Sequence, residues 1–271
     1  MKYKFGFIGC GNMGGALAQA VAKSVNPFEI ALCDANLEKA AALAESLGCG
    51  VALLEQVAKD CEYIFLGVKP QGFEGLFETI SPILKARKDR FVLVSMAAGV
   101  SLAAVEKMCG TLAPVIRIMP NTPVACGCGM TLYTKNALVS DAALATFLSA
   151  MEHSGKLMAV AEEKFDAESI VTGCGPAYVF MFIEGMAKAA EALGATPEAA
   201  RLYAEQTVLG AATLALTTGR DPAALRDAVC SPGGTTIEGV RSLAADGLCD
   251  QVVKAAQASY KRTLELAGEK K

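Results

Sequence analysis

A glycine-rich segment near the N-terminus has the spacing of a dinucleotide-binding loop. Gly9, Gly11 and Gly14 spell G-x-G-x-x-G, directly after a predicted strand and at the start of a predicted helix. In such a loop the first glycine allows a tight turn, the second lets a pyrophosphate approach the backbone, and the third permits close helix–strand packing. The helix start then offers free N–H groups to the phosphates. The residues predicted to bind a nicotinamide dinucleotide here are Ile8, Gly9, Cys10, Gly11, Asn12, Met13 and Gly14; the alternative is a purely structural glycine turn.

An acidic residue follows the second predicted strand, in the sequence CDANLEK. Asp34 lies 20 residues after Gly14, where a carboxylate accepts hydrogen bonds from the adenosine ribose. A 2′-phosphate carries a charge of about −1.5 to −2, so a neighbouring carboxylate repels it, and Ala35 supplies no compensating cation. We therefore predict that NADH is preferred over NADPH. The alternative is that Asp34 only caps the helix expected to start near Leu37.

Three short segments after later strands are predicted to lie at the same edge of the sheet. They read GVKP at 67–70, SMAAG at 95–99 and MPNTP at 119–123. In an open α/β sheet, ligands bind outside the carboxyl ends of the strands. For 67–70 a plain strand exit is the alternative. The predicted cofactor contacts are Val68, Lys69, Pro70, Ala97, Ala98, Met119 and Asn121.

The segment SPGGTT, residues 231–236, contains no group that titrates near neutral pH. Gly233 and Gly234 have no side chains, and Thr235 with Glu238 fits a capping box for the helix that follows. The segment therefore offers bare N–H groups at a helix start, which suits a small carboxylate. The alternative is a glycine-rich helix entry with threonine caps.

The elements that position these segments alternate in the first part of the chain. Continuous apolar runs separated by helical patterns are typical of a parallel sheet covered on both faces. We predict a Rossmann-type, doubly wound α/β domain over residues 1–160 that binds the dinucleotide. The predicted strands cover 3–9, 29–34, 62–68, 90–96, 113–119, 129–134 and 156–160, with helices over 11–25 and 36–48.

From Glu162 onward the sequence contains no convincing strand pattern. Glycines fit helix stops, and prolines at 197 and 222 fit first-turn positions. We therefore predict an all-helical domain over residues 161–271. Its helices are expected at 162–170, 175–194, 197–218, 222–229, 235–245 and 248–268.

Composition narrows the possible partners. The chain has 271 residues and a net charge of −3, and without a basic stripe we expect no nucleic-acid partner. Its ten cysteines form no C-x-x-C pair and His153 is the only histidine, so we expect no metal site and read the cysteines as small buried hydrophobes in the cytoplasm. The N-terminal apolar run, Phe5 to Cys10, is too short for a signal sequence. Glu184 and Lys188 interrupt the most apolar helix, so we expect no membrane partner.

Six segments give the chain a resemblance to a known family. They read GFIGCGNMG, GVKPQ, SMAAG, RIMPNTP, TGCGPAYVF and AVCSPGGTTIEG, in this order and over nearly the whole chain. In this respect the chain resembles the pyrroline-5-carboxylate reductases. It departs from the usual family form S-G-S-G-P-A-Y at Thr172 and Cys174, which replace two serines.

The resemblance implies an enzyme that reduces 1-pyrroline-5-carboxylate to L-proline with NAD(P)H, the last step of proline biosynthesis. It implies Thr236 and Glu162 as catalytic residues, with Thr236 near the imine nitrogen and Glu162 near the same ring atom. For Glu162 the alternative is a helix N-terminal acid that interacts with the dipole. A protonated imine accepts hydride readily, so positioning matters more than a strong protein acid. The implied substrate-binding residues are Ser231, Gly233, Gly234, Thr235, Thr236 and Glu162.

The resemblance also implies homo-oligomers built through the helical domains, either dimers or pentamers of dimers. The apolar stretches AYVFMF and AATLALTT suit a buried dimer core. Two alternatives remain at this point. One is a β-hydroxyacid-dehydrogenase-like oxidoreductase with Lys188 as its catalytic lysine. The other is a non-enzymatic regulator that binds a nicotinamide dinucleotide.

Overall fold

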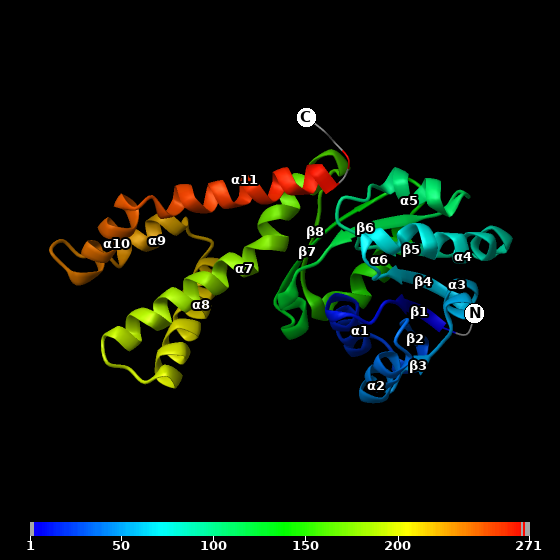
Figure 1. Cartoon of the computed structure of the whole chain (residues 1–271), viewed down its shortest axis with the longest axis horizontal. Coiled ribbons are helices and arrows are strands. Elements are labelled where there is room, and N and C mark those ends of the chain that lie inside the picture. The colour runs from blue at the N-terminus through cyan, green and yellow to red at the C-terminus, as the bar shows by residue number, and fades with distance from the viewer. Residues whose placement is uncertain (1–2, 267, 269–271) are drawn as a thin grey trace. The chain divides into compact units, whose positions relative to one another are not determined.

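A computed structural model describes residues 3–266 and residue 268 of the chain. Within them the backbone forms two compact units. We call the first the sheet unit; it comprises the described residues up to Cys174 and those from Ser259 onward. The second, the helical unit, comprises Gly175–Ala258 (Figure 1). The domain boundary expected near residue 161 stays a prediction.

The sheet unit is organised around one sheet of eight strands, in the order β3-β2-β1-β4-β5-β6-β7-β8. From β3 to β6 all neighbouring strands pair in parallel. The order 3-2-1-4-5-6 is that of a Rossmann fold, so the predicted fold class is confirmed. The strands are β1 Tyr3–Ile8, β2 Ile30–Cys33, β3 Gly50–Val51, β4 Cys61–Leu66, β5 Val92–Ser95, β6 Val115–Met119, β7 Gly129–Lys135 and β8 Gly155–Ala159.

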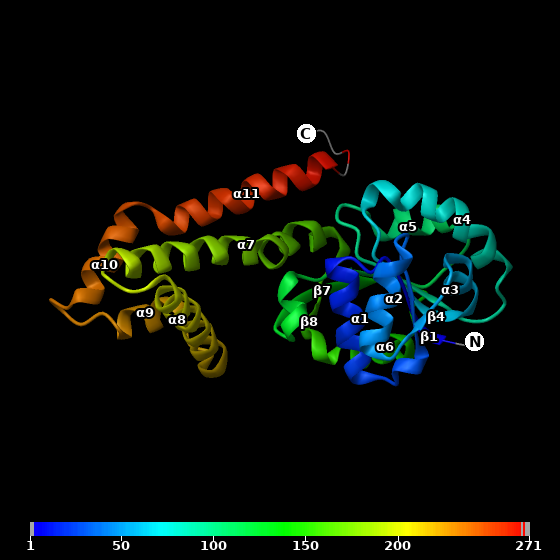
Figure 2. The same cartoon turned by 60° about the horizontal axis from the view of Figure 1, so that its bottom comes forward.

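Helices cover both faces of this sheet (Figures 1 and 2). One apolar core lies between the sheet and α3, α4 and α5, and a second lies between the opposite face and α1, α2 and α6. Consecutive strand residues alternate between the two cores, as Phe65 and Leu66 do in β4, which explains why the strands read as continuous apolar runs. The helices are α1 Asn12–Ser24, α2 Leu37–Leu47, α3 Leu54–Asp60, α4 Phe73–Ala86, α5 Leu102–Cys109 and α6 Asp141–Ala150.

The far edge of the sheet differs from the prediction of an entirely parallel sheet. Strand β7 runs antiparallel to β6, and β8 is parallel to β7. The connection from β6 to β7 contains only the short 3-10 helix η3, Thr122–Cys126, whereas a parallel crossover needs a dozen or more residues. No range was predicted for β3, because a two-residue strand leaves no periodic pattern, and none for helices α3 to α6.

The helical unit contains no strand among its described residues. Its structure corrects one prediction: α7 is a single helix, not two helices interrupted at residues 171–174. Glycines weaken a helix without forbidding it, and Pro176 removes only one backbone hydrogen bond. The predicted helix 248–268 includes residue 267, which lies outside the described residues. The helices are α7 Glu162–Ala192, α8 Pro197–Thr218, α9 Pro222–Ala228, α10 Thr235–Ala245 and α11 Leu248–Leu266. The first turns of α7, up to Cys174, and the end of α11, from Ser259, belong to the sheet unit.

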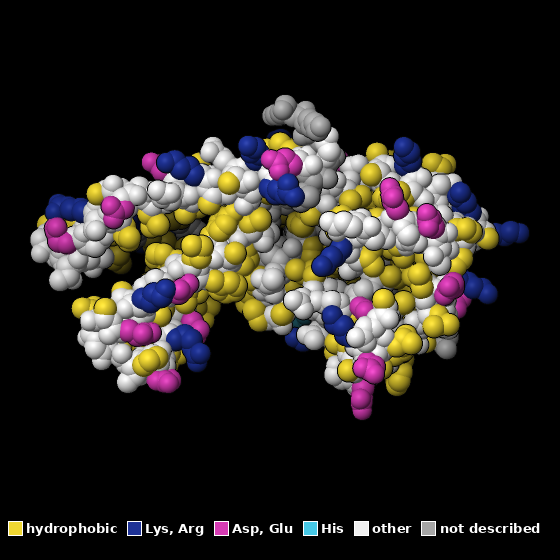
Figure 3. All heavy atoms as spheres, in the orientation of Figure 1, with side chains coloured by type: hydrophobic (Ala, Val, Ile, Leu, Met, Phe, Trp, Pro, Cys, Tyr) yellow, Lys and Arg dark blue, Asp and Glu magenta, His cyan; other side chains and the backbone are white. Residues whose placement is uncertain are grey.

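Large apolar side chains lie exposed on the helical unit, and Figure 3 shows them gathered along its helices. Among the described residues of this unit, the buried hydrophobic ones are Ala200 and Ala204 alone. By length and composition α7 could cross a membrane, with a mean hydropathy of 1.4 in its most apolar window, although one such helix is weak evidence. The absence of a membrane partner therefore stays a prediction. The exposed side chains include Val179, Phe180, Met181, Phe182, Leu202, Tyr203, Leu209, Leu214 and Leu216.

Candidate functional site

The glycine loop after β1 is packed too closely for side chains at two of its positions. The Gly9 N–H donates to the Cys33 carbonyl oxygen at 2.7 Å, and the Gly67 N–H donates to the Ile8 oxygen at 2.7 Å. Gly9 has a φ of 99°, and a Cβ on it would lie 2.6 Å from the Gly67 oxygen. A Cβ on Gly14 would lie 2.0 Å from the Gly9 oxygen. Because Gly9 and Gly14 have no side chains, the backbones at the ends of β1 and β4 and at the start of α1 can pack against one another.

The middle glycine of the loop has different surroundings. A Cβ built on Gly11 would meet no atom within 4 Å. Gly11 is also the N-cap of α1, and no side chain caps the helix. The loop thus combines free N–H groups, the positive end of a helix dipole and open space, and these features fit a pyrophosphate.

Asp34 is held against this loop. Its carboxylate accepts from the Cys10 N–H at 2.6 Å and from the Asn36 N–H at 2.9 Å. The side chain that caps α2 is Asn36, which accepts from the Lys39 N–H at 3.1 Å. The capping alternative for Asp34 is therefore wrong, and the carboxylate stands beside the predicted cofactor loop.

The cysteines divide into packing groups and exposed thiols. Burial, with the nearby Asp34 carboxylate as the next cause, raises the pKa of Cys10 to about 11. Burial likewise raises the pKa of Cys61 to about 12. All ten cysteines are free. The prediction of buried thiols is correct for Cys10, Cys33, Cys61 and Cys109 and wrong for Cys126, Cys128 and Cys249, which are exposed.

The other predicted cofactor contacts follow strands that are neighbours in the sheet. Their segments come after β4, β5 and β6, which continue the sheet from β1. Parallel strands share one carboxyl edge, so the structure brings these segments and the glycine loop to the same edge. Their individual contacts with a cofactor stay predictions. The residues are Val68, Lys69, Pro70, Ala97, Ala98, Met119 and Asn121.

Asn121 already has partners at both ends of its amide. It is 8% exposed. Its Oδ1 accepts from the Met130 N–H at 2.9 Å, and its Nδ2 donates to the Thr172 carbonyl oxygen at 2.9 Å. The side chain thus fixes the turn after β6 against both β7 and α7.

Glu162 belongs to an ion cluster that was not predicted from the sequence, in which a buried arginine pairs with two half-buried carboxylates. Arg117, in β6, is 1% exposed and donates to Glu162 Oε1 at 3.1 Å and to Asp166. Its guanidinium carbon lies 4.4 Å from the ring centroid of Phe165. Glu162 Oε1 also accepts from the Leu102 N–H at 2.9 Å, at the start of α5. The only signal in the sequence was one charged residue inside the apolar strand VIRIM.

The turn at SPGGTT differs from the predicted capping box. The Gly234 N–H donates to the Ser231 oxygen at 3.0 Å, and Gly233 has a φ of 71°. Gly234 is the N-cap of α10, so Thr235 is already the first helical residue and cannot cap it. The capping-box prediction is wrong because the helix starts at Thr235, one residue earlier than the box requires.

Because this earlier start makes Gly234 the N-cap residue, the N-terminus of α10 has no side-chain cap. Glu238 instead pairs with Arg241 at 2.7 Å on the exposed side of the helix. The first N–H groups of α10 therefore face solvent, together with the exposed hydroxyl group of Thr236. Such an end suits a carboxylate.

Lys188 is the remaining candidate for a reactive group. Lys188 pairs with Glu184 at 2.5 Å on the surface of α7, and this pairing raises the pKa of Lys188, so it is a poor proton acceptor. Among the described residues, no group of three or more His, Cys, Asp or Glu side chains could hold a metal. The prediction of no metal stays a prediction.

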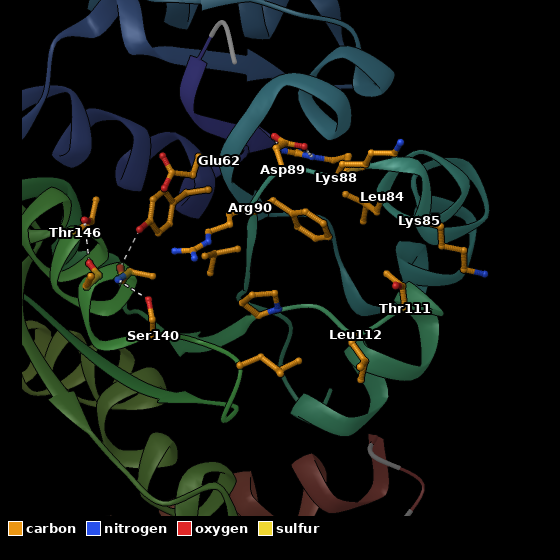
Figure 4. Close-up of a pocket in the computed structure, with 18 residues that line it drawn as sticks. Glu62, Leu84, Lys85, Lys88, Asp89, Arg90, Thr111, Leu112, Ser140 and Thr146 are labelled. Carbon is orange, nitrogen blue, oxygen red and sulfur yellow. Dashed lines mark hydrogen bonds and ion pairs between the residues drawn. The ribbon is translucent and has the colours of Figure 1, made fainter.

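A cavity of about 610 Å³ lies in the sheet unit, away from the predicted cofactor edge. It is lined by the first residues of β4 and by residues that precede β5 and α6, with Glu62 and Arg90 on one side and Lys85 and Thr111 on the other (Figure 4). These positions lie at the amino ends of the strands. Ligands of doubly wound folds bind at the opposite edge.

Comparisons with known proteins cover both units. Residues 162–266 match the family model for pyrroline-5-carboxylate reductase dimerisation, and residues 4–99 match the model described as NADP oxidoreductase, coenzyme F420-dependent. The pyrroline-5-carboxylate reductase of Escherichia coli (strain K12) is 42% identical over 259 residues, covering 94% of this chain and 95% of that protein. That of Arabidopsis thaliana is 36% identical over 272 residues, covering 98% and 96%.

Solved structures agree with these relatives. The pyrroline-5-carboxylate reductase from Coxiella burnetii has a TM-score of 0.88 at 33% identity, covering 98% of this chain and 99% of that one. The Plasmodium falciparum enzyme, with NADP bound, has a TM-score of 0.85 at 26% identity, with the same coverage. From the glycine loop to the SPGGTT turn, the chain belongs to the pyrroline-5-carboxylate reductase family.

Proposed function

We propose that this protein reduces 1-pyrroline-5-carboxylate to L-proline with a reduced nicotinamide dinucleotide, as the last step of proline biosynthesis. The observation that carries the proposal is the uncapped start of α10 behind the SPGG turn. It is a ready anion site in a chain that also has an open dinucleotide loop at Gly11. The dehydrogenase alternative is not favoured, because its candidate lysine, Lys188, lies exposed in a surface pair with Glu184 and the curated relatives are pyrroline-5-carboxylate reductases.

The reaction makes modest demands on the chain's own residues. When bound, the reduced nicotinamide supplies the hydride. The amides that follow Gly233 bind the substrate carboxylate, and the Thr236 hydroxyl group hydrogen-bonds the ring nitrogen. The Glu162 carboxylate, the second proposed catalytic residue, favours the protonated imine by its charge. Orientation of the ring, more than acid strength, then determines the rate.

The direct test is a spectroscopic assay with purified protein. We expect that adding 1-pyrroline-5-carboxylate to protein and NADH or NADPH lowers the absorbance of the reduced nicotinamide, and that mass spectrometry detects proline. A reaction without the pyrroline is the control. Turnover of 3-hydroxy acids in its place, or cofactor binding with no turnover, would contradict the proposal.

We propose further that NADH is preferred over NADPH. The Asp34 carboxylate beside the glycine loop repels a 2′-phosphate and accepts from a free 2′-hydroxyl group. The expected preference is about 1–3 kcal/mol, roughly a five- to hundredfold ratio of kcat/KM. The Plasmodium falciparum relative was solved with NADP bound, so the proposed preference concerns this chain and its Asp34 and is not extended to the family.

Removing the acidic residue and placing a cation beside it tests this preference. Asp34→Ser combined with Ala35→Arg is expected to reverse the ratio of the two kcat/KM values. Asp34→Ser alone is the control that separates lost repulsion from gained attraction. A wild-type enzyme that already uses NADPH better would contradict the preference without affecting the proposed reaction.

The assembly and location of the protein are proposed on the same basis. The match to a dimerisation model over residues 162–266 and the exposed apolar helices support a homo-oligomer, either a dimer or a pentamer of dimers. The ten free cysteines are in keeping with the cytoplasm. The proposed partner is the small-molecule substrate, without nucleic acid or membrane.

A further inference from the structure

We infer that Asn121 is a positioning residue, which ties the turn after β6 to a gap that Pro176 makes in the hydrogen bonding of α7. The inference rests on the proposed function, because the turn lies at the sheet edge assigned to the cofactor. In this role Asn121 holds the backbone of the turn through its bonds to α7 and β7, in addition to any contact it makes with the cofactor.

The gap follows from the chemistry of proline. Pro176 lies inside α7 and has no backbone N–H. In a regular α-helix the N–H of residue 176 would donate to the carbonyl oxygen of Thr172. That carbonyl therefore lacks its helical partner, and leaving a shielded carbonyl without a donor is unfavourable.

Asn121 supplies the missing donor. Its Nδ2 lies 2.9 Å from the Thr172 oxygen, and its Oδ1 accepts from the Met130 N–H at 2.9 Å. A primary amide can donate at one end and accept at the other, and no other neutral side chain of this length does both. Because Asn121 is 8% exposed, water does not readily replace either bond.

The position of Asn121 in the backbone also points to this role. It is the N-cap of η3, where an asparagine side chain would ordinarily bond to the helix that follows. Here the side chain makes no such bond and reaches α7 and β7. Nearby, a Cβ on Gly173 would lie 3.9 Å from Met119 Cγ, so α7 approaches the turn closely on this side.

What the amide positions is the turn Met119–Pro123. The turn carries two of the predicted cofactor contacts and follows β6 at its carboxyl end. Because both ends of the Asn121 amide are hydrogen-bonded, the backbone of the turn is fixed relative to the sheet. If this bond is lost, we expect weaker binding of the reduced nicotinamide and slower turnover, since small displacements of positioning groups reduce rates strongly.

A double-mutant cycle tests the connection. Asn121→Asp keeps an acceptor for the Met130 N–H and removes the donor to Thr172. Pro176→Ala returns an N–H to α7, which can donate to Thr172 directly. Pro197→Ala is the matched control, because Pro197 starts α8, where an N–H has no helical acceptor.

In the otherwise wild-type chain, we expect Asn121→Asp to raise the Kd for reduced nicotinamide, measured by fluorescence titration, and to lower kcat/KM, each by about tenfold. In the Pro176→Ala background the same change should cost about twofold at most. In the Pro197→Ala background it should cost the full tenfold. Asn121→Leu, which is neutral, repeats the cycle if the aspartate variant does not fold.

Equal losses in the Pro176→Ala and Pro197→Ala backgrounds would overturn the inference. So would a fall in Tm with unchanged Kd and kcat/KM, because that pattern indicates packing alone. If the wild-type protein does not reduce 1-pyrroline-5-carboxylate, the proposed function fails, yet the Kd values still decide whether Asn121 and Pro176 act together.

Discussion

Strand β4 and helix α7 are both rich in large apolar residues, yet their side chains have different surroundings. In β4, Tyr63, Ile64, Phe65 and Leu66 are all buried, at most 1% exposed. In α7, by contrast, Phe180 is 61% exposed. The apolar residues of the strand complete a core within one chain. Those of the helix over residues 179–182 are exposed, whereas Phe165 and Ile170 near its start are buried.

The difference shows that similar composition can encode a core in one region and an interface in another. Large exposed apolar patches mark binding surfaces. The match of residues 162–266 to a dimerisation model supplies the partner, a second copy of the chain. The helical unit would then gain through association the burial that the sheet unit achieves alone.

The largest expected effect comes from placing a charge on each region in turn. Phe180→Asp is expected to weaken association by about a thousandfold, or about 4 kcal/mol, because a buried interface would have to desolvate an unpaired carboxylate. Phe28→Asp is the matched control, since Phe28 is 79% exposed on the sheet unit. Light scattering over a dilution series measures both. Equal dissociation of the two variants would remove the distinction between the regions.

A smaller effect is expected within the glycine loop. Gly14→Ala should lower stability by about 3 kcal/mol or more, because its Cβ would lie 2.0 Å from the Gly9 oxygen and the backbone must shift. Gly11→Ala should leave Tm nearly unchanged and still weaken nicotinamide binding, because its Cβ enters open space. Thermal unfolding and fluorescence titration separate the two. A clearly lowered Tm for Gly11→Ala would contradict this, because it would mean that the position is needed for stability and is not reserved for the cofactor.

The smallest effect tests whether the helical unit contributes chemistry as well as contacts. Thr236→Val keeps the shape of the side chain and removes its hydroxyl group. We expect kcat/KM to fall about ten- to hundredfold, or about 1–3 kcal/mol, with the oligomer intact. An unaltered kcat/KM would leave this part of α10 with a structural role only.

The sequence predicted the sheet unit well because its signals are local. Runs such as EYIFLGV exclude most alternatives to a buried parallel strand. The direction of β7 was missed because alternation along a strand does not encode which neighbour it joins. The prediction divides helix α7 in two because Pro176 and the glycines before it usually end helices. The donor that accommodates the proline, Asn121, lies 51 positions before its acceptor Thr172 in the sequence.

In the candidate site, too, features set by neighbouring residues could be predicted and features set by distant residues could not. The glycine loop could be recognised because its spacing and backbone requirements are contained in six residues. The capping box at Thr235 failed because a one-residue shift in the helix start cannot be read from composition. The ion cluster of Arg117, Glu162 and Asp166 joins residues up to 49 positions apart, so only the folded chain reveals it.

That cluster also restricts how the chain can change over evolutionary time. Replacing Arg117 by an apolar residue would leave the carboxylates of Glu162 and Asp166 one helical turn apart without their shared cation. Changing either carboxylate first would remove part of the compensation for a guanidinium that is almost fully buried. Each single step passes through a poorly compensated charge, so the three residues are expected to vary together or not at all among descendants of this chain.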